Sequence, residues 1–317
     1  MRAAVLTDSG FSLRADAPLP EVGEGDVRVR VLRAGICETD LQLIRGYMGF
    51  RGILGHEFVG VAETGGFAGQ RVVGEINCSC HACAACRSGL ANHCPHRTVL
   101  GILGRDGAFA DYVSLPERNL HPVPVEVTDE QAVFVEPLAA AFQIPAQIPD
   151  LAGRRVLVLG DGRLGQLCAQ VLQLAQTRLT VIGKHPHKLA ILAGQGIDAG
   201  LRGEVLPDRA ADVVVDCTGT PSGITDAFLW LRPRGTLVLK TTVAGTPEVS
   251  WAPIVIDELQ VIGSRCGPFA PALAALAAGT VNVAPLISAR FPLEEVDRAF
   301  EHVRGSGALK VLLDVSA

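Results

Sequence analysis

An apolar run that ends in a glycine-rich turn constrains the fold of this chain more than any other segment. The run covers residues 155–159 (RVLVL), the turn covers residues 160–165 (GDGRLG), and a helical stretch follows as far as Ala175. A continuous apolar run of this length is typical of a strand buried on both faces of a parallel sheet. A G-x-G-x-x-G turn between such a strand and a helix is typical of a dinucleotide-binding unit. We therefore expect the cofactor to lie against Gly160, Gly162, Leu164 and Gly165.

Further strand and helix patterns alternate along the same part of the chain. A helical stretch covers residues 187–193, and short strand patterns cover residues 179–182, 212–216, 236–239 and 259–263. Alternation of this kind is typical of a doubly wound α/β domain with a parallel sheet, the Rossmann arrangement. A stretch broken by Pro145 and Pro149 precedes the first strand. We therefore place this domain over residues 145–266.

The residues that follow the second of these strands bear on the choice of cofactor. Sites for NAD usually carry Asp or Glu about 20 residues after the glycines, where the carboxylate binds the ribose hydroxyls. This chain has Gly183, Lys184 and His185 there, and the next acid is Asp198. Without a carboxylate to repel it, a 2′-phosphate can pair with Lys184 and His185. We expect NADP, with NAD as the alternative if Lys184 is only a solvated surface lysine.

The composition argues against several other classes of protein. Of the 317 residues, 48% are hydrophobic and 19% are charged, which provides for a buried core and argues against long disordered segments. A net charge of −5 argues against a nucleic-acid-binding protein. No apolar stretch reaches the roughly 18 residues of a membrane-spanning helix, and Asp8 comes too early for a secretory signal. We expect a cytoplasmic protein of about two domains, with neither nucleic acid nor a membrane as partner.

Five of the nine cysteines crowd into the segment from Cys78 to Cys94. Four of them follow the pattern C-x2-C-x2-C-x7-C, at Cys80, Cys83, Cys86 and Cys94. In an intracellular chain such a cluster indicates a metal site rather than disulfides. Four thiolates from one loop match a closed, structural zinc site, with an iron–sulfur centre as the chemical alternative. The histidine pair of a nucleic-acid-binding zinc finger is missing, so we expect a structural zinc lobe over about residues 78–95.

A second set of metal-binding residue types is spread along the chain. Cys37 follows a strand pattern that begins at residues 27–31 (VRVRV), and His56 comes 19 residues after it, within G-H-E. Glu136 stands much later, just before the α/β domain. Cys, His and Glu side chains all serve as zinc ligands, and three ligands plus water form an open, catalytic site. Taken singly, each residue has a plainer interpretation, such as a buried thiol, a core histidine or a surface acid.

The order of the motifs changes that interpretation. G-I-C-x-T-D, G-H-E, the four-cysteine lobe, E-P-L and the glycine turn follow one another along this chain. In this order they resemble the zinc-dependent medium-chain dehydrogenase/reductase family of alcohol, polyol, threonine and glucose dehydrogenases. The resemblance implies a β-rich, partly open barrel-like (GroES-like) catalytic domain into which the Rossmann domain is inserted. The catalytic domain would span residues 1–144 and 267–317, with the Rossmann domain over residues 145–266.

The resemblance also implies roles for individual residues. Cys37 and His56 look like ligands of a catalytic zinc ion. The third ligand would be Glu57, as in polyol-dehydrogenase-like members, or Glu136, whose position serves in others. Thr39 resembles the hydroxyl that links the substrate oxygen to a proton relay, and Asp40 is expected to support the fold near the zinc. Relatives form dimers or tetramers through the Rossmann domain, so we expect a homodimer or homotetramer.

These features together predict a zinc-dependent oxidoreductase that transfers hydride between an alcohol, polyol or sugar and NADP. An NAD-linked polyol, threonine or sugar dehydrogenase is the first alternative. One departure from the family supports a second alternative. Many relatives carry a histidine in the proton relay, where this chain has Gln42, and glutamine cannot titrate. The second alternative is a non-catalytic dinucleotide-binding regulator, and the complete set of zinc-binding residue types argues against it.

Overall fold

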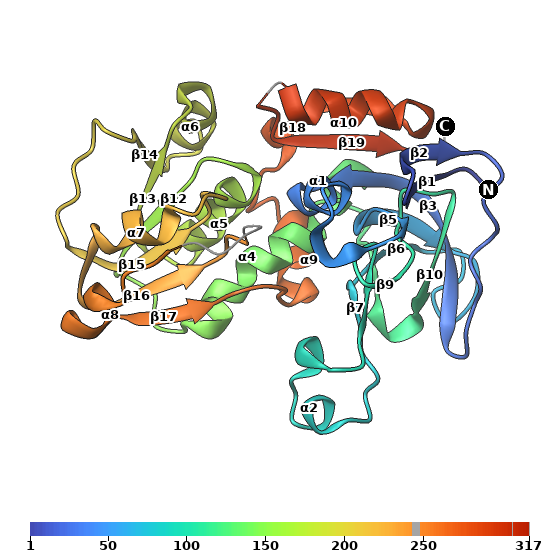
Figure 1. The fold of residues 1–317 in the computed structure, drawn as a ribbon, viewed down its shortest axis with the longest axis horizontal. Helices are drawn as coiled ribbons and strands as arrows, with labels where there is room; N and C mark the ends of the chain where they lie inside the picture. Colours follow the sequence, from blue (N-terminus) through green and yellow to red (C-terminus); the bar gives the residue numbers. More distant parts are fainter. Residues whose placement is uncertain (243–247, 306, 317) are drawn as a thin grey trace. The chain divides into compact units, whose positions relative to one another are not determined.

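The computed structural model describes residues 1–242, 248–305 and 307–316 (Figure 1). The chain divides into two compact units: unit 1 is Met1–Glu136 with Ala272–Ala317, and unit 2 is Pro137–Pro271. The boundaries that we drew from the sequence, after residues 144 and 266, fall inside unit 2. One reason is that helix α4 (Val135–Gln147) runs unbroken through Pro145, where the sequence suggested an interruption. Within the described ranges, no helix is both long and apolar enough to span a membrane.

The sheet of unit 2 has six strands in the order β14-β13-β12-β15-β16-β17, and every neighbouring pair is parallel. In chain order this is the 3-2-1-4-5-6 arrangement of a doubly wound dinucleotide-binding sheet. The predicted Rossmann domain is therefore confirmed. The strands are β12 (Arg155–Leu159), β13 (Arg178–Gly183), β14 (Asp198–Leu201), β15 (Ala211–Asp216), β16 (Leu231–Leu239) and β17 (Gln260–Gly263).

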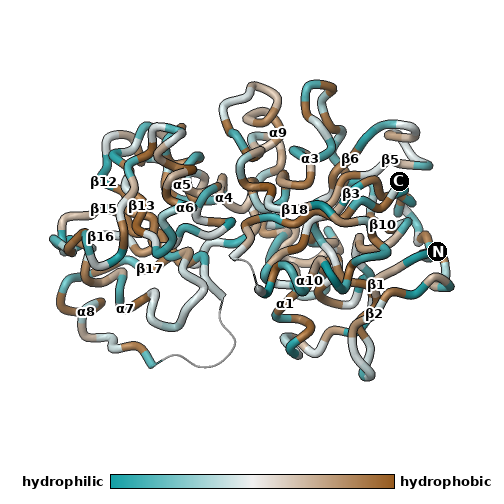
Figure 2. The backbone as a smooth tube through the Cα atoms, turned by 90° about the horizontal axis from the view of Figure 1, so that it is seen from above, coloured by the Kyte–Doolittle hydropathy of each residue, from teal (hydrophilic) through white to brown (hydrophobic). Residues whose placement is uncertain are grey.

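Helices follow most of these strands and help to bury them. In α5, residues 165–172 are buried, as expected of a helix that packs on the sheet. The core beside β15 and β16 includes Phe228 at the end of α7 and Trp230 just after the helix. Figure 2 shows hydrophobic residues along the central strands β12, β13 and β15. The helices that follow these strands are α5 (Arg163–Leu174), α6 (Pro186–Ala193), α7 (Gly223–Phe228) and α8 (Ala252–Ile256), and α9 (Phe269–Ala277) begins in unit 2 and ends in unit 1.

Unit 1 is built mainly from short antiparallel strands. Its largest sheet runs in the order β11-β6-β5-β3-β19-β18, and β10 also pairs with β3. The smaller sheets have the orders β2-β1-β4 and β7-β8-β9. The strands are β1 (Ala3–Thr7), β2 (Gly10–Arg14), β3 (Asp26–Ile36), β4 (Gly52–Ile53), β5 (Glu57–Ala62), β6 (Arg71–Gly74), β7 (Asn77–Cys78), β8 (Thr98–Leu100), β9 (Gly104–Arg105), β10 (Tyr112–Pro116), β11 (Leu120–Pro122), β18 (Ile287–Pro292) and β19 (Lys310–Asp314).

Strand β3 organises unit 1. Its first half pairs with β10, its middle and end pair with β5, and its last residues pair with β19 from the far end of the chain. Alternate residues of the first half are buried, as the alternating sequence predicted. The strand therefore brings two distant segments, β5 and β19, to the position where it ends. The helices of this unit are α1 (Glu38–Ile44), α2 (Ala84–Arg87), α3 (Asp129–Ala132) and α10 (Val296–Gly305).

Candidate functional site

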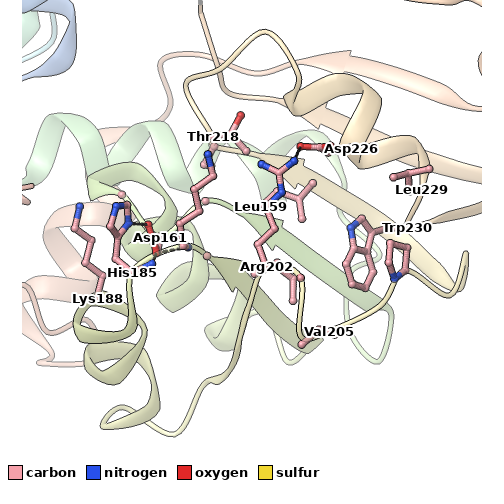
Figure 3. A pocket seen from close by; sticks show the side chains of 18 of the residues that line it. Leu159, Asp161, His185, Lys188, Arg202, Val205, Thr218, Asp226, Leu229 and Trp230 are labelled. Atoms are coloured by element: carbon pink, nitrogen blue, oxygen red, sulfur yellow. Dashed lines mark hydrogen bonds and ion pairs between the residues drawn. The ribbon is translucent and has the colours of Figure 1, made fainter.

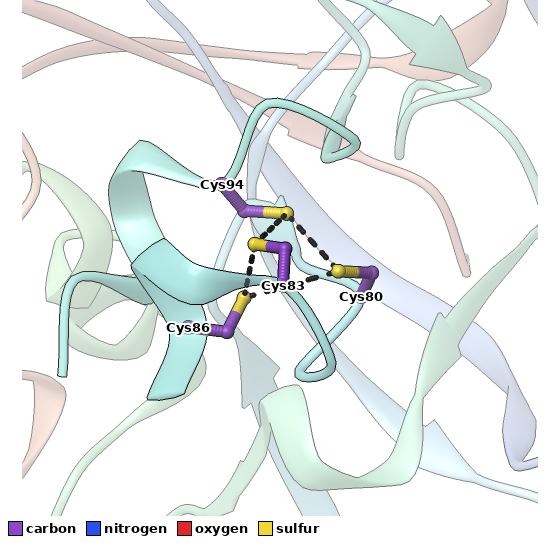
Figure 4. Close-up of side chains that lie close together, drawn as sticks. All are labelled: Cys80, Cys83, Cys86 and Cys94. Atoms are coloured by element: carbon purple, nitrogen blue, oxygen red, sulfur yellow. Dashed lines mark hydrogen bonds between the residues drawn. The ribbon is translucent and has the colours of Figure 1, made fainter. Parts of the chain in front are cut away.

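Four cysteine side chains converge in the loop between β7 and β8 (Figure 4). The Sγ atoms of Cys83 and Cys86, and those of Cys94 and Cys80, are 3.5 Å apart. The Cys83–Cys94 and Cys80–Cys86 distances are 3.8 and 4.0 Å. Disulfide sulfurs would lie about 2.0 Å apart, so these thiols are free. The predicted spacing pattern therefore brings all four sulfurs together.

The sulfur cluster has the size that a bound zinc ion requires. With Zn–S bonds of about 2.3 Å, the sulfurs of a tetrahedral site lie about 3.8 Å apart. Sulfurs this close leave no room for an iron–sulfur cluster between them. Backbone N–H groups of Ala82 and Cys83 lower the pKa of Cys80 to about 6, whereas desolvation and neighbouring sulfurs raise the pKa of Cys86 to about 12. Close thiolates repel one another, and a bound cation would offset that repulsion. The four sulfurs therefore fit a zinc ion. Cys78 lies outside the group, and burial raises its pKa to about 11.

A second group of donor atoms lies where the central strand of unit 1 ends. β3 ends at Ile36, and Cys37 follows as the N-cap residue of α1. Glu57 begins β5 and pairs with Gly35 of β3, and His56 directly precedes it. Donor atoms of Cys37, His56 and Glu57 all lie within 4.8 Å of one another. Sheet pairing thus gathers three side chains that stand apart in the sequence.

Two of these three residues are buried, Cys37 is partly buried, and several buried polar atoms of the site lack a hydrogen-bond partner among the described residues. His56 and Glu57 are 3% and 1% exposed. Nδ1 of His56, Oε1 of Glu57 and Oδ1 of Asp40 have no hydrogen-bond partner among the described residues. Burial opposes the charged form of His56, but Asp40 and Cys37 outweigh it and raise the pKa of His56 well above its ordinary value. A buried, electronegative group with unsatisfied atoms suits a cation, and sulfur, nitrogen and oxygen donors fit zinc.

The other oxygen of Glu57 has a partner that our sequence analysis missed. Oε2 of Glu57 accepts a hydrogen bond from Nζ of Lys310 in β19, and the two side chains form an ion pair that is 1% and 2% exposed. A Cβ on Gly35 would lie 2.8 Å from this oxygen and 3.3 Å from Cδ of Lys310, so the pair occupies the space above a glycine. The signal in the sequence was an isolated lysine within the apolar run LKVLL.

Not every residue that we associated with this site joins the cluster. Glu136 lies in the first turn of α4 and is not one of the clustered donors among the described residues. Oγ1 of Thr39 lies 3.9 Å from Sγ of Cys37. Oδ2 of Asp40 accepts a hydrogen bond of 2.8 Å from the backbone N–H of Cys37, which supports the structural role expected of Asp40. Gln42 donates a hydrogen bond to Glu38 at 3.1 Å, on the outside of α1.

The glycine-rich turn lines a cavity of about 400 Å³ in unit 2. Gly160 has a φ of +112°, and a Cβ there would lie 2.5 Å from the carbonyl oxygen of Cys217. Nothing lies within 4 Å of the position of a Cβ on Gly162, so a ligand can approach its backbone. A Cβ on Gly165 would lie 2.0 Å from the carbonyl oxygen of Gly160. Leu164 and Gly165 do not line the cavity. The turn and the start of α5 fit the phosphates of a dinucleotide.

Basic side chains line the same cavity. Its walls include Gly183, Lys184, His185, Lys188 and Arg202. Burial lowers the pKa of Lys188, whose side chain lies beside Asp161 and His185 (Figure 3). Arg202 forms an ion pair of 2.8 Å with Asp226. Our sequence analysis did not identify Lys188 or Arg202, because both follow the second strand at distances that no motif specifies.

Comparison with known families accounts for both units of the chain. The alcohol dehydrogenase GroES-like domain matches residues 23–125, and the zinc-binding dehydrogenase domain matches residues 164–278. The first match covers most of the β-rich segment that carries the two clusters, and the second begins within the glycine-rich turn. The predicted combination of a GroES-like domain with a Rossmann domain is therefore confirmed. The fold and the donor clusters define the class: an oxidoreductase of the zinc-binding dehydrogenase type.

Individual proteins extend this similarity over nearly the whole chain. L-threonine 3-dehydrogenase of Streptomyces avermitilis is 32% identical over 94% of both chains. Sorbitol dehydrogenase of Halalkalibacterium halodurans is 30% identical over 99% of both. A protein of Sinorhizobium meliloti described as a zinc-binding dehydrogenase, bound to NADP, superposes with a TM-score of 0.88 at 28% identity over 99% of both chains. An alcohol dehydrogenase of Escherichia coli complexed with NADH gives a TM-score of 0.90 at 26% identity over 99% of both. This chain belongs to the zinc-dependent medium-chain dehydrogenase family.

Proposed function

We propose that this protein transfers hydride between a nicotinamide dinucleotide, with NADP preferred, and an alcohol, polyol or sugar or its carbonyl form. The observation that carries the proposal is the convergence of Cys37 with the buried side chains of His56 and Glu57. Two relatives are named for threonine and sorbitol, and both compounds carry secondary hydroxyl groups. A small hydroxylated molecule is therefore the proposed substrate class.

The residues of the buried cluster would hold a catalytic zinc ion. Zinc at such a site acts as a Lewis acid toward a substrate oxygen, and the dinucleotide carries the hydride. We infer that Glu57 rather than Glu136 is the third protein ligand, because Oε1 of Glu57 is buried without a hydrogen-bond partner among the described residues. Asp40 would orient the ligands, since its oxygens lie 3.4 Å from Nδ1 of His56 and 2.8 Å from the backbone nitrogen of Cys37.

Proton transfer in this proposal begins at Thr39. Its hydroxyl can accept one proton while it donates another, and it lies beside the cluster at 3.9 Å from Sγ of Cys37. Gln42 cannot titrate, and its amide is already bonded to Glu38. The Thr39 hydroxyl would therefore take the proton of the substrate hydroxyl and pass a proton on to water or to a ribose hydroxyl.

Two further groups complete the proposed holoenzyme. Cys80, Cys83, Cys86 and Cys94 would hold a structural zinc ion that fixes the loop between β7 and β8. NADP would bind in the cavity of unit 2, with its pyrophosphate on the glycine-rich turn and its 2′-phosphate among the basic side chains. Lys184, His185, Lys188 and Arg202 support this choice, because they give one end of a dinucleotide site several cations.

Absorbance of the reduced nicotinamide tests the activity directly. The zinc-replete full chain is assayed with NADP and NAD against primary and secondary alcohols, polyols, aldoses and 3-hydroxy amino acids. We expect turnover with at least one class, higher with NADP than with NAD, and two zinc ions per chain. Absence of turnover throughout the panel together with a single zinc ion would contradict the proposal and favour a regulatory protein.

Matched cysteine variants separate the two metal sites. Cys37→Ser should abolish turnover and remove one zinc ion while the affinity for the dinucleotide stays unchanged. Cys78→Ser is the control, because this buried thiol belongs to neither cluster. Near-normal turnover of Cys37→Ser would exclude the catalytic role of the cluster.

We also propose that the protein is a homo-oligomer joined through unit 2. β17 is an edge strand of the six-stranded sheet. Near it in the sequence, Trp251, Val255 and Ile256 are 71%, 74% and 77% exposed, and Val261 in the strand itself is 42% exposed. An exposed apolar edge strand is a template for pairing with a second chain.

The cytoplasmic location that we expected from the sequence stays a prediction.

A further inference from the structure

The acidic residue within the glycine-rich turn makes contacts that its motif does not require. The side chain of Asp161 is turned toward the end of β13, and the residue is 5% exposed. Oδ2 accepts hydrogen bonds of 2.7 Å from the backbone N–H groups of Lys184 and of His185. Oδ1 lies 2.9 Å from Nδ1 of the His185 ring (Figure 3). Asp161 thus ties the first turn to the residues that follow the second strand.

The carboxylate of Asp161 occupies the space that a side chain at residue 183, at the end of β13, would otherwise fill. A Cβ on Gly183 would lie 2.4 Å from Oδ2 of Asp161, so residue 183 has to be glycine while Asp161 is present. Dinucleotide sites that select NAD place an acid at this end of the strand to bind the ribose hydroxyls. Here Asp161 of the neighbouring turn places a carboxylate at this position instead, but its oxygens already accept hydrogen bonds from Lys184 and His185. Asp161 and His185 both line the cavity, and the ring of His185 is bonded to the carboxylate.

The carboxylate fixes the tautomer of that histidine. Burial opposes the charged form of Asp161, but the hydrogen bonds from the ring and backbone of His185 and from the backbone of Lys184 outweigh it and lower the pKa of Asp161. An ionised carboxylate only accepts hydrogen bonds, so Nδ1 of His185 must carry a proton. In neutral His185 the other nitrogen, Nε2, then has a free lone pair. When the ring gains a proton, Nε2 becomes a donor.

We propose that the Asp161–His185 pair makes the binding of a 2′-phosphorylated dinucleotide depend on a proton. Neutral His185 accepts a hydrogen bond from a ribose 2′-hydroxyl, and protonated His185 donates one to a 2′-phosphate. NADPH binding therefore takes up a proton at His185, whereas NADH binding does not. Asp161 is a positioning residue that acts through His185. This inference rests on the proposed dinucleotide site in unit 2.

The charged groups around His185 favour this assignment. Besides Asp161, they are Lys184 next to it, His187 and Lys188 on α6, Arg163 at the start of α5, and Arg202, which is paired with Asp226. The ring of His187 lies 5.9 Å from that of His185, whereas the ring of His185 is the one that contacts Asp161 in the described part of the chain. The cations among these groups would attract a phosphate dianion to the neighbourhood of His185. The bound dianion in turn stabilises the protonated imidazole.

Isothermal titration calorimetry of the zinc-loaded full chain tests the inference. NADPH and NADH are each titrated at pH 7.5 in buffers of different ionisation enthalpy, so that the binding heat reports the number of protons taken up. We expect uptake of a fraction of a proton with NADPH and none with NADH. Between pH 6.5 and 8.5 the NADPH affinity should fall by up to about tenfold per pH unit, while the NADH affinity varies by less than about twofold. Equal proton uptake for the two dinucleotides would overturn the inference.

Isosteric variants assign the proton to the pair. In Asp161→Asn the amide oxygen keeps the backbone hydrogen bonds, and the amide N–H₂ faces Nδ1 of His185. Nδ1 must then accept, so the proton moves to Nε2 and neutral His185 already donates to a phosphate. We expect this variant and His185→Gln to bind NADPH without proton uptake. His187→Gln is the matched control, two positions away, and should behave like the wild type.

The outcomes separate this inference from the proposed function. Wild-type proton uptake in Asp161→Asn or in His185→Gln would overturn the role of the pair. Tighter binding of NADH than of NADPH at every pH would overturn the preference for NADP, while proton uptake with NADPH alone would still support the pair. Failure of both dinucleotides to bind would overturn the proposed function and this inference with it.

Discussion

Replacing Lys310 by Met removes the ammonium that faces Glu57 and keeps a long apolar side chain in β19. The carboxylate that remains is 1% exposed. In the zinc-free protein no metal balances this carboxylate, so removal of Lys310 leaves a buried charge without compensation. Such a loss destabilises a protein by about 3–5 kcal/mol. A tenfold change in an equilibrium constant corresponds to about 1.4 kcal/mol, so local opening of unit 1 should become about 100- to 4,000-fold more frequent.

Hydrogen exchange of the zinc-free protein, measured by mass spectrometry, suits this prediction. Trp230 and Trp251 both lie in unit 2, and the chain has two tryptophans, so intrinsic tryptophan fluorescence does not report on unit 1. Peptides that cover β3, β5 and β19 report the opening of the sheet around the ion pair directly. Their protection should fall in Lys310→Met, while peptides from β12 and β13 in unit 2 keep their protection.

Two further variants identify the origin of the effect. Lys184→Met makes the same substitution at an exposed lysine and should leave exchange in unit 1 unchanged. The double variant Glu57→Gln with Lys310→Met carries no unpaired charge and should recover most of the lost protection. A change of less than about fivefold in Lys310→Met, corresponding to about 1 kcal/mol, would refute the reasoning.

Three shorter predictions follow from other features. Cys94→Ser should lower the zinc content from two ions to one and expose the loop between β7 and β8 to proteolysis; two zinc ions in this variant would exclude the proposed lobe. Gly160→Ala should weaken NADPH binding at least tenfold in a fluorescence titration, because its Cβ would lie 2.5 Å from a carbonyl oxygen. A tenfold loss corresponds to about 1.4 kcal/mol of binding free energy. Wild-type affinity of this variant would contradict the role of the turn. Val261→Lys should lower the mass measured by sedimentation, since it charges the edge strand, and an unchanged mass would exclude that interface.

The sequence was most informative where local pattern and tertiary structure agree. The run at residues 155–159 is both apolar and bounded by glycines, and it forms β12 as predicted. β14 (Asp198–Leu201) escaped prediction, because a strand of four residues with alanine and glycine at its centre carries no apolar pattern. α4 escaped because Pro145 suggested a break, although the helix continues through it.

Contacts between residues far apart in the chain could not be predicted from the sequence. Lys310 and Glu57 are 253 residues apart, and their pairing follows from the strand order β5-β3-β19, which no local motif specifies. Our proposal of Glu57 rather than Glu136 as a zinc ligand rests on the pairing of β5 with β3, which no local motif specifies either. The cofactor rule considered only the residues after the second strand, so it overlooked Asp161, whose carboxylate reaches that position from the first turn.

The position of β19 near the end of the chain also determines when the sheet of unit 1 can be completed during synthesis. Ribosomes add about 5–20 residues per second, so the 253 residues between Glu57 and Lys310 correspond to roughly ten seconds to a minute of synthesis. During that time the end of β3 has no β19 beside it, and the nascent sheet presents an unpaired edge. The carboxylate of Glu57 has no lysine to pair with until β19 leaves the ribosome.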